Sequence, residues 1–249
     1  MLKGATPKNC LGGIEYSVWN SVSGRYIQIG GKKLFGFNFD KRILYGLLAV
    51  MALYMIMSAG QDGILGFLLA LPAVLIAISF HEFAHAYTAY KLGDDTPKIQ
   101  GRITLNPFRH LDIMGFLMLM FAHFGWGKPV QINPNRFDRK ISLTAAEAIV
   151  AIAGPIMNFI LSIIFTIVYA LAVRYLSADF LDTGMGNAVL NIIYYIIWLN
   201  VGLGVFNLIP IPPLDGSKVL YHFLSYEGRS WFEKNQNVFY IVFLVVWIT

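Results

Sequence analysis

Four stretches of this chain contain no charged residue and are rich in apolar ones. They cover residues 43–60, 63–80, 148–173 and 183–213. Each approaches or exceeds the roughly 20 residues that an α-helix needs to cross a bilayer core. The composition agrees, because only 13% of the residues are charged, whereas soluble domains carry about 25%. The sequence therefore predicts an all-α polytopic membrane protein with about five to six membrane helices.

Lysine and arginine are concentrated next to the expected spans. They are frequent in residues 1–42, 91–112 and 128–140, and they are absent from the connections at 61–62 and 175–186. Short basic loops mark the cytoplasmic side of a membrane protein. We therefore expect the N-terminus and the basic loops in the cytoplasm and the two connections outside. Basic residues that flank membrane spans do not form a nucleic-acid site, so no nucleic acid is expected as a partner.

Residues 113–127 are apolar but short, and both of their flanks are basic. A segment with both ends inside cannot cross the membrane once, so we expect it to enter and leave on the cytoplasmic side. The flanking segments KIQGRITLNP (98–107) and KPVQINP (128–134) are predicted to be short and extended. Non-helical backbone at this depth requires cover from protein or a water-filled cavity. The sequence thus predicts a re-entrant β-like element between the first two core helices, with a polar cavity near the cytoplasmic side.

The domain organisation follows from these spans. Residues 1–42 are expected to form a cytoplasmic N-terminal head, and residues 26–39 of it alternate apolar and polar residues around Gly30-Gly31, as in a β-hairpin. Residues 43–249 are expected to form an integral membrane domain. The opening MLKGATPKNC has no apolar core, so a cleavable signal is not expected.

The strongest chemical motif lies at the end of the second apolar run. Residues 81–85 read His-Glu-Phe-Ala-His, the pattern HExxH. On a helix, residues four apart share a face, so His81 and His85 can hold one Zn²⁺ while Glu82 takes a proton from the attacking water. Ionisable side chains inside a membrane span are costly and mark functional sites. At about 1.5 Å per residue, the histidines lie roughly 15 and 9 Å before Lys91, the first basic residue beyond them.

A catalytic zinc site commonly has a third protein ligand, and the candidate is Asp215 in FNLIPIPPLDGS (206–217). The prolines of this segment stop the fourth span, which should end on the same side as the HExxH motif. Asp215 either completes a His₂Asp site or is a solvated aspartate in a helix-ending turn. The rivals are the histidines outside the motif, and none of them has a second ligand-type residue at metal spacing: His110, His123 and His222.

Asn158 is an amide within the apolar run 148–173, and a buried amide needs hydrogen-bond partners. It is a candidate catalytic residue, because it could donate a hydrogen bond to the substrate carbonyl or to the oxyanion of the tetrahedral intermediate. The alternative is an interhelical hydrogen bond of the kind that membrane helices often use. Both interpretations remain open at the level of the sequence.

Taken together, three motifs resemble the site-2 protease family of intramembrane zinc metalloproteases. They are HExxH in one helix, Gly154-Pro-Ile-Met-Asn158 in the next, and Asn207-Leu-Ile-Pro210 followed by Leu214-Asp215-Gly216 in a third. The segments GRITLNPFRHLD, FGWGKPVQINPNRF and PIPPLDGS are similar to its compact prokaryotic subgroup without a PDZ insertion. The likeness covers a core of about residues 63–220. It implies that His81, His85 and Asp215 bind zinc, that Glu82 activates water and that the re-entrant segment presents the substrate as a strand.

We therefore expect an intramembrane zinc endopeptidase that hydrolyses peptide bonds within or near transmembrane segments, in regulated intramembrane proteolysis. Its expected partners are a transmembrane protein substrate and the lipid bilayer, in a prokaryotic cell membrane with the active site toward the cytoplasm. The alternatives are a metal-binding transporter, since broken helices also mark carriers, and a proteolytically inactive homologue that binds substrates. A transporter would not need Glu82. The sequence does not identify the substrate, the cleavage position, a regulatory partner or the oligomeric state.

Overall fold

The computed structural model describes residues 41–112, 115–116, 127–239 and 241. Contacts along the chain divide it into two units, Met1–Asp40 and Lys41–Thr249. The expected hairpin at 26–39, and the expected head apart from its last two residues, lie outside the described residues. The head therefore stays a prediction.

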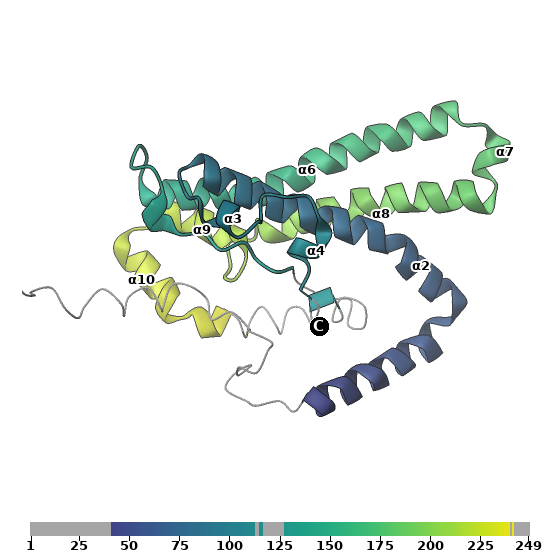
Figure 1. Cartoon of the computed structure of the whole chain (residues 1–249), viewed down its shortest axis with the longest axis horizontal. Coiled ribbons are helices and arrows are strands. Elements are labelled where there is room, and N and C mark those ends of the chain that lie inside the picture. Colours follow the sequence, from purple (N-terminus) through teal and green to yellow (C-terminus); the bar gives the residue numbers. More distant parts are fainter. Residues whose placement is uncertain (1–40, 113–114, 117–126, 240, 242–249) are drawn as a thin grey trace, which may run out of the picture. The chain divides into compact units, whose positions relative to one another are not determined.

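Three long helices dominate the described part of the chain (Figure 1). They are α2 (Lys41–Lys91), α6 (Leu143–Tyr175) and α8 (Gly184–Asn207). The shorter helices that connect or follow them are α3 (Thr96–Ile99), α4 (Pro107–His110), the 3₁₀ helix η1 (Pro134–Arg136), α7 (Ala178–Leu181), α9 (Asp215–Phe223) and α10 (Tyr226–Lys234). No strand occurs among the described residues, so the prediction of a mainly helical protein is confirmed.

Within the described residues, three helical segments are long and apolar enough to cross a bilayer: Leu65–Lys91, Leu143–Tyr175 and Gly184–Asn207. They match three of the expected spans. Helix α2, however, does not end at residues 61–62, where the sequence predicts a connection between two spans. Gly60 and Gly63 flank Asp62 and weaken a helix, but the first proline comes ten residues later. The number of spans beyond these three stays a prediction.

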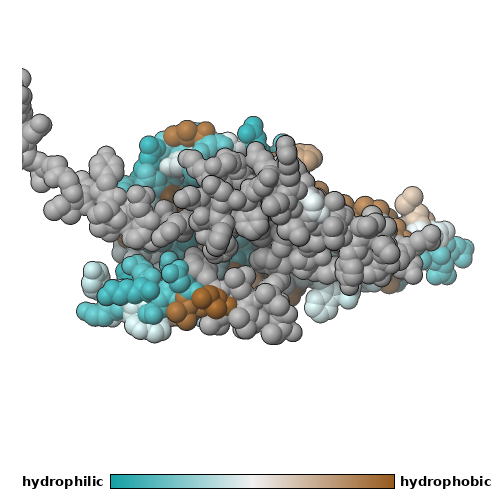
Figure 2. Space-filling view, turned by 90° about the horizontal axis from the view of Figure 1, so that it is seen from below, coloured by the Kyte–Doolittle hydropathy of each residue, from teal (hydrophilic) through white to brown (hydrophobic). Residues whose placement is uncertain are grey.

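The outer faces of the long helices are apolar. On α6 the side chains of Ile160, Ile163, Ile164 and Ile167 are between 45% and 61% exposed. Figure 2 shows hydrophobic surface, in brown, between hydrophilic ends. A row of exposed isoleucines is unfavourable in water and favourable against lipid chains. These faces are therefore suited to the bilayer.

The inner faces carry small residues where the helices meet. Ala77 and Ala84 of α2 and Ala151 and Gly154 of α6 are buried. On α8, a Cβ added to Gly204 would meet the ring of Phe159 at 3.0 Å. Small residues at such positions let helix backbones approach closely, which is how membrane helices gain packing energy without a hydrophobic driving force. The polar groups described below are enclosed by this close packing.

The connection between α2 and α6 differs from its prediction. Lys98 and Ile99 belong to α3, so the expected extended segment at 98–107 is wrong at its start. Pro97 accounts for this, because its fixed φ angle favours the first turn of a helix. The strand-like contact among the described residues is an isolated antiparallel bridge between Leu111 and Gly127. Residues 113–114 and 117–126 lie outside the described part of the chain, and the re-entrant β-like element is not confirmed.

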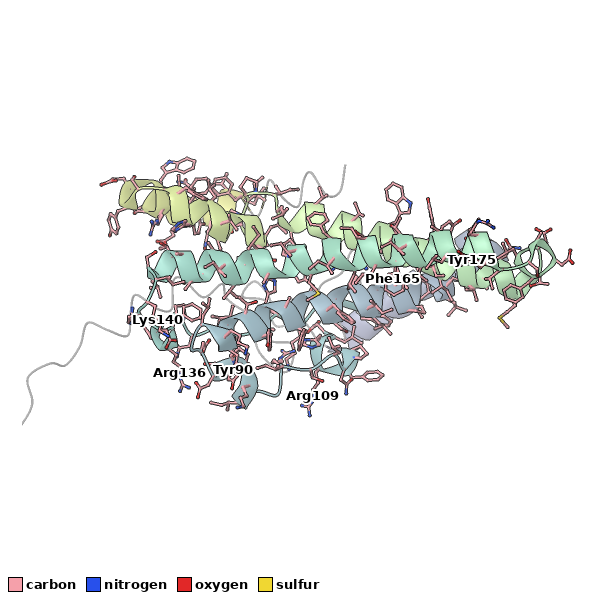
Figure 3. The ribbon with its side chains drawn as sticks, turned by 90° about the horizontal axis from the view of Figure 1, so that it is seen from above. Tyr90, Arg109, Arg136, Lys140, Phe165 and Tyr175 are labelled. Atoms are coloured by element: carbon pink, nitrogen blue, oxygen red, sulfur yellow. The ribbon has the colours of Figure 1, made fainter. Side chains whose placement is uncertain are left out.

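Hydrogen bonds and apolar contacts hold the segment that precedes α6 against the C-terminal end of α2, the helix that carries HExxH. The fully buried carboxylate of Asp94 accepts hydrogen bonds from the backbone N–H of Thr96 at 3.0 Å and of Asn133 at 2.6 Å. Phe137 packs with Ala89 of α2 and Val150 of α6 in a small apolar core. This fastening lies at the basic end of the bundle, where Figure 3 shows Arg136 and Lys140, whereas Tyr175 lies at the opposite end of α6.

We predict that Asp94→Ala lowers the free energy of unfolding by about 2 kcal/mol, because it leaves two partly buried backbone N–H donors without their acceptor and an unsatisfied buried donor costs roughly 1–3 kcal/mol. Thermal unfolding in detergent and limited proteolysis measure the effect, with new cleavage expected near Asn133. Asp95→Ala is the matched control. It removes only an exposed ion pair with Arg136, worth less than about 1 kcal/mol. Equal stability of the two variants would contradict the fastening role of Asp94.

Candidate metal centre

The two histidines of the HExxH motif meet at the inner face of α2. Helical spacing places His81 and His85 one above the other, and their Nε2 atoms are 3.0 Å apart. Both residues are buried, with exposed fractions of 6% and 7%. Two imidazole nitrogens thus converge within the segment Leu65–Lys91, which is one of the candidate membrane spans.

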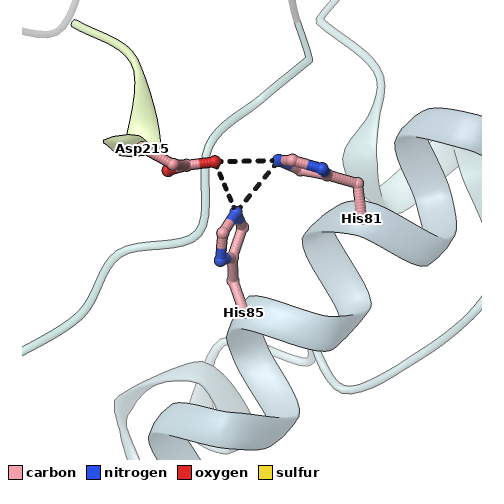
Figure 4. A group of neighbouring side chains, drawn as sticks. All are labelled: His81, His85 and Asp215. Atoms are coloured by element: carbon pink, nitrogen blue, oxygen red, sulfur yellow. Dashed lines mark hydrogen bonds and ion pairs between the residues drawn. The ribbon is translucent and has the colours of Figure 1, made fainter. Parts of the chain in front are cut away.

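Asp215, which lies much later in the sequence, contacts both histidines of this pair (Figure 4). Its Oδ2 atom is 3.1 Å from Nε2 of His81 and 3.1 Å from Nε2 of His85. The local sequence explains the approach, because α8 ends at Asn207 and α9 begins at Asp215 itself. A Cβ at Gly216 would lie 2.2 Å from the carbonyl oxygen of Leu208. Only glycine therefore allows α9 to begin so close to the end of α8.

Hydrogen bonds determine which nitrogen of each histidine faces the centre. His81 Nδ1 is 2.6 Å from Oδ1 of Asn158, and His85 Nδ1 is 2.7 Å from the carbonyl oxygen of Val150. Since both partners are acceptors, each Nδ1 carries the proton and donates it. Each Nε2 then presents a lone pair, and both lone pairs face a carboxylate oxygen. Three electron pairs converge without a proton between them, and a cation resolves this conflict.

The spacing of the three donor atoms suits zinc. Ligand atoms about 2.0–2.1 Å from a tetrahedral zinc ion lie roughly 3.3–3.4 Å apart, and here the three separations are 3.0, 3.1 and 3.1 Å. His81, His85 and Asp215 form a group that could hold a metal ion. Two imidazoles with one carboxylate are also a typical donor set for catalytic zinc. The residues present therefore fit the metal that the motif predicts.

Gly154 of α6 lies directly against the two histidine rings. A Cβ at this position would be 2.5 Å from Nε2 of His85 and 2.7 Å from Nε2 of His81. Such distances are too short for any side chain, so α6 can pass here only as glycine. The missing side chain leaves the space in front of the two lone pairs free for an ion.

The electrostatics of the centre keep Asp215 ionised. Burial by itself would raise the pKa of its carboxyl group. A proton on Nε2 of the histidines, in the place of a metal ion, outweighs burial through attraction to His85 and hydrogen bonds from both rings, and it holds the pKa below its ordinary value. A carboxylate that stays ionised can serve as a ligand at neutral pH. The position therefore favours positive charge beside it.

Glu82 turns toward the segment that follows the bridge at Gly127. The backbone N–H of Val130 donates to Oε2 of Glu82 at 3.0 Å. The guanidinium of Arg102 donates to the carbonyl oxygen of Arg109 and, at 3.4 Å, to that of Pro129. Arg102 thus ties both sides of the connection together next to Glu82. The HExxH carboxylate is held by this segment and is not part of the three-atom ligand group.

Asn158 is fully buried, and all of its polar atoms have partners. Besides the contact with His81, its Nδ2 donates to the carbonyl oxygen of Ala77 at 3.2 Å and to Oδ1 of Asn200 at 2.8 Å. Sequence reasoning singled out Asn158 but missed Asn200. The available signal was the same for both, an amide in a long apolar run, but the run 183–213 contains several such amides.

The rival histidines lie elsewhere or outside the described residues. His110 is fully buried and its Nε2 donates to the carbonyl oxygen of Thr104 at 2.7 Å. His222 Nδ1 is 3.3 Å from the hydroxyl of Thr144, near the start of α6. His123 lies outside the described residues. Among the residues that the structure describes, only His81, His85 and Asp215 come together as a ligand group.

Comparisons with known proteins agree with this geometry. Residues 176–249 match the description "Peptidase family M50". "Putative zinc metalloprotease YwhC" of Bacillus subtilis is 39% identical over 182 residues, which cover 71% of this chain and 78% of that protein. The chain belongs to peptidase family M50, the site-2 protease family. It is a zinc metalloendopeptidase, so the predicted family and enzyme class are confirmed.

More distant M50 relatives cover most of the chain as well. "Putative zinc metalloprotease Rip2" of Mycobacterium tuberculosis is 31% identical over 206 residues, 81% of this chain and 73% of that protein. "Putative zinc metalloprotease MJ0611" of Methanocaldococcus jannaschii is 29% identical over 189 residues, 74% and 86% of the two chains. No solved structure matches the chain significantly.

We predict that Gly154→Ala abolishes stoichiometric zinc binding in this M50 peptidase, because the new Cβ would occupy the space before both Nε2 atoms. Elemental analysis of the purified variant measures zinc content, and circular dichroism measures helix content. Glycine to alanine normally stabilises a helix by about 1 kcal/mol, but here the Cβ would also push α6 away from α2. The helix content and the unfolding temperature of the metal-free variant therefore separate loss of the ion's place from loss of the fold.

Gly202→Ala in α8 is the matched control, since a Cβ there meets nothing within 4 Å. It should keep full zinc content. Normal zinc content in Gly154→Ala would show that the metal does not bind between these three side chains.

Proposed function

We propose that this M50 peptidase cleaves transmembrane proteins inside the bilayer, with His81, His85 and Asp215 as zinc ligands and Glu82 as the general base. The observation that carries the proposal is the convergence of two histidine lone pairs and one carboxylate within a candidate span. The exposed isoleucines of α6 support a position in lipid for the surrounding helices. The substrate is then a membrane protein, because its scissile bond must reach this depth.

Each residue has a defined task in this proposal. His81, His85 and Asp215 would hold the zinc ion, which would supply Lewis acidity to the attacking water and the scissile carbonyl. Glu82 removes the proton from the attacking water and delivers it to the leaving amine, as a general base and then a general acid. The N–H of Val130 orients one oxygen of Glu82, which leaves the other oxygen available for the proton. His81 and His85 keep their protons on Nδ1 throughout.

We propose a positioning role for Asn158. Oxyanion stabilisation needs a free N–H donor, and both protons of the Asn158 amide are engaged by Ala77 and Asn200. Donation to the oxyanion would break one of these bonds in a fully buried place. The contact with Nδ1 of His81 supports the other interpretation from the sequence, in which Asn158 links membrane helices.

The alternatives make a different demand on Glu82. A metal transporter has no use for a carboxylate beside its ligands that is not itself a ligand. An inactive homologue would tolerate loss of the base. Here Glu82 is held by a backbone donor adjacent to the ligand group, an arrangement that serves proton transfer. This contact favours the peptidase over both alternatives.

We predict that Glu82→Gln keeps zinc but loses peptide hydrolysis by a factor of at least about 10², the scale of a lost general base. Asp215→Ala should lose zinc and activity together, and Asp215→Asn should be intermediate because it keeps an oxygen ligand without the charge. Zinc content by elemental analysis and cleavage of single-span substrates by mass spectrometry give the two readouts. Full turnover in Glu82→Gln would refute the proposed chemistry, and full zinc in Asp215→Ala would remove the third ligand.

We also propose that the active site opens toward the cytoplasm. Lys140 and Arg136 lie at the end of α6 where the connection to α2 is fastened (Figure 3). The opposite connection, 175–186, carries aspartates and no lysine or arginine. The positive-inside rule supports this orientation.

Single cysteines in a Cys10→Ser background test the orientation. Gln100, Asn135 and Asp179 are exposed, so a cysteine at each can react if the reagent reaches it. In intact cells an impermeant thiol reagent should label Asp179→Cys only. After permeabilisation all three should be labelled, which controls for reactivity. Labelling of Gln100→Cys or Asn135→Cys in intact cells, without labelling at 179, would show the reverse orientation.

A further inference from the structure

A chain of side-chain amides runs from the metal centre across all three long helices. His81 on α2 contacts Asn158 on α6, and Asn158 contacts Asn200 on α8 at 2.8 Å. Asn200 then donates from Nδ2 to the carbonyl oxygen of Ile196, one turn earlier on its own helix, at 2.8 Å. Both asparagines have no exposed surface.

The hydrogen bond between Asn200 and Ile196 determines how both side-chain amides are oriented. The carbonyl oxygen of Ile196 can only accept, so Asn200 must turn its NH₂ group toward it and its Oδ1 toward α6. Asn158 must then turn its own NH₂ group toward Asn200, and the carbonyl oxygen of Ala77 demands the same orientation. The Oδ1 of Asn158 therefore faces His81 and accepts the proton of Nδ1. Each step leaves a single arrangement in which every donor meets an acceptor.

The consequence reaches the metal. If Asn158 were turned over, its NH₂ group would face His81 and favour the tautomer with the proton on Nε2, where it would block a ligand position. The flipped amide would also place Oδ1 opposite two acceptors, Oδ1 of Asn200 and the carbonyl oxygen of Ala77. Asn200 thus opposes the flip of Asn158 through its own hydrogen bond to Asn158, without being one of the proposed metal ligands. Without this second acceptor, only Ala77 would hold Asn158 in place.

We infer that Asn200 is a positioning residue, which acts through Asn158 to keep the Nε2 lone pair of His81 available to zinc. This inference rests on the proposed ligand role of His81. Groups that hold a metal-binding histidine by its other nitrogen typically change metal affinity 10–100-fold when they are removed. Asn200 lies one hydrogen bond further from His81 than Asn158 does. The carbonyl oxygen of Ala77 also helps to orient Asn158. The loss of Asn200 should therefore have a smaller effect in the same direction.

The test compares zinc affinities by competition with a chromophoric chelator, using the full chain in detergent. Asn158→Leu should weaken zinc binding roughly 10–100-fold, and Asn200→Leu about 3- to 10-fold, a smaller share of the same effect. Asn200→Asp should bind zinc almost as tightly as the unchanged protein. A carboxyl group buried among apolar residues stays protonated, so its O–H can donate to Ile196 and its carbonyl oxygen can accept from Asn158.

Asn187→Leu is the matched control. Asn187 lies on the same helix and makes the same bond to its own backbone, from Nδ2 to the carbonyl oxygen of Thr183 at 3.1 Å, but it is exposed. Its replacement should leave zinc affinity unchanged. The unfolding temperature of each metal-free variant reports on folding, and the rise in that temperature on adding zinc gives an independent measure of binding.

A double-mutant cycle decides whether Asn200 works through Asn158. In an Asn158→Leu background, the further change Asn200→Leu should no longer alter zinc affinity, because the intermediate group is gone. Unchanged zinc binding in Asn200→Leu, equal weakening in Asn200→Asp, or full additivity in the double variant would each overturn the inference. If Asn200→Leu does not fold, Asn200→Ala replaces it in every comparison. Failure of the unchanged protein to bind zinc would instead refute the proposed metal site.

Discussion

The structure depends on one constraint, the need to satisfy every polar group within an apolar bundle. His81 and His85 each have two ring nitrogens, and burial leaves no water to bind the second one. Asn158 and Val150 of α6 supply acceptors for both Nδ1 protons. The same bonds that satisfy the rings also direct two lone pairs at Asp215. The hydrogen bonds that satisfy the buried imidazoles thus also orient them for a metal ion. These bonds require α6 to pack closely against α2.

That close packing explains the glycine at position 154. Elsewhere in the bundle, small residues serve packing, as Gly204 does against Phe159. At Gly154 the absent side chain has a second consequence, because the space it leaves lies directly before the two Nε2 atoms. The GPxxN motif can therefore be understood from its two ends. In the proposed site Gly154 leaves the space for the ion, and Asn158, one helical turn further on, holds the proposed ligand His81.

The part of the site that the sequence predicted is the part encoded by local spacing. HExxH defines its geometry within one helical turn, and the prolines before Asp215 predict where α8 must end. Asn200 has no such spacing signal, since Asn187, Asn191 and Asn207 occur in the same apolar run and only the packing of α8 against α6 selects one of them. The extended segment expected at 98–107 is wrong at its start, because Pro97 initiates a helical turn that the alternation of residues did not indicate. Helix α2 continues through 61–62, where a connection is expected, although Gly60 and Gly63 flank Asp62.

The origin of the third ligand also connects metal binding to folding. His81 and His85 lie on one helix and would be neighbours in any helical conformation of α2. Asp215 belongs to a separate element, α9, which packs on α6 and begins close to the end of α8 at Gly216. An ion bound by all three residues therefore stabilises the packing of α9 onto the long helices, since binding energy at a site that exists only in the folded state adds to folding energy. In the proposed site the long helices orient two ligands through internal hydrogen bonds, and the metal itself would contribute to holding the third.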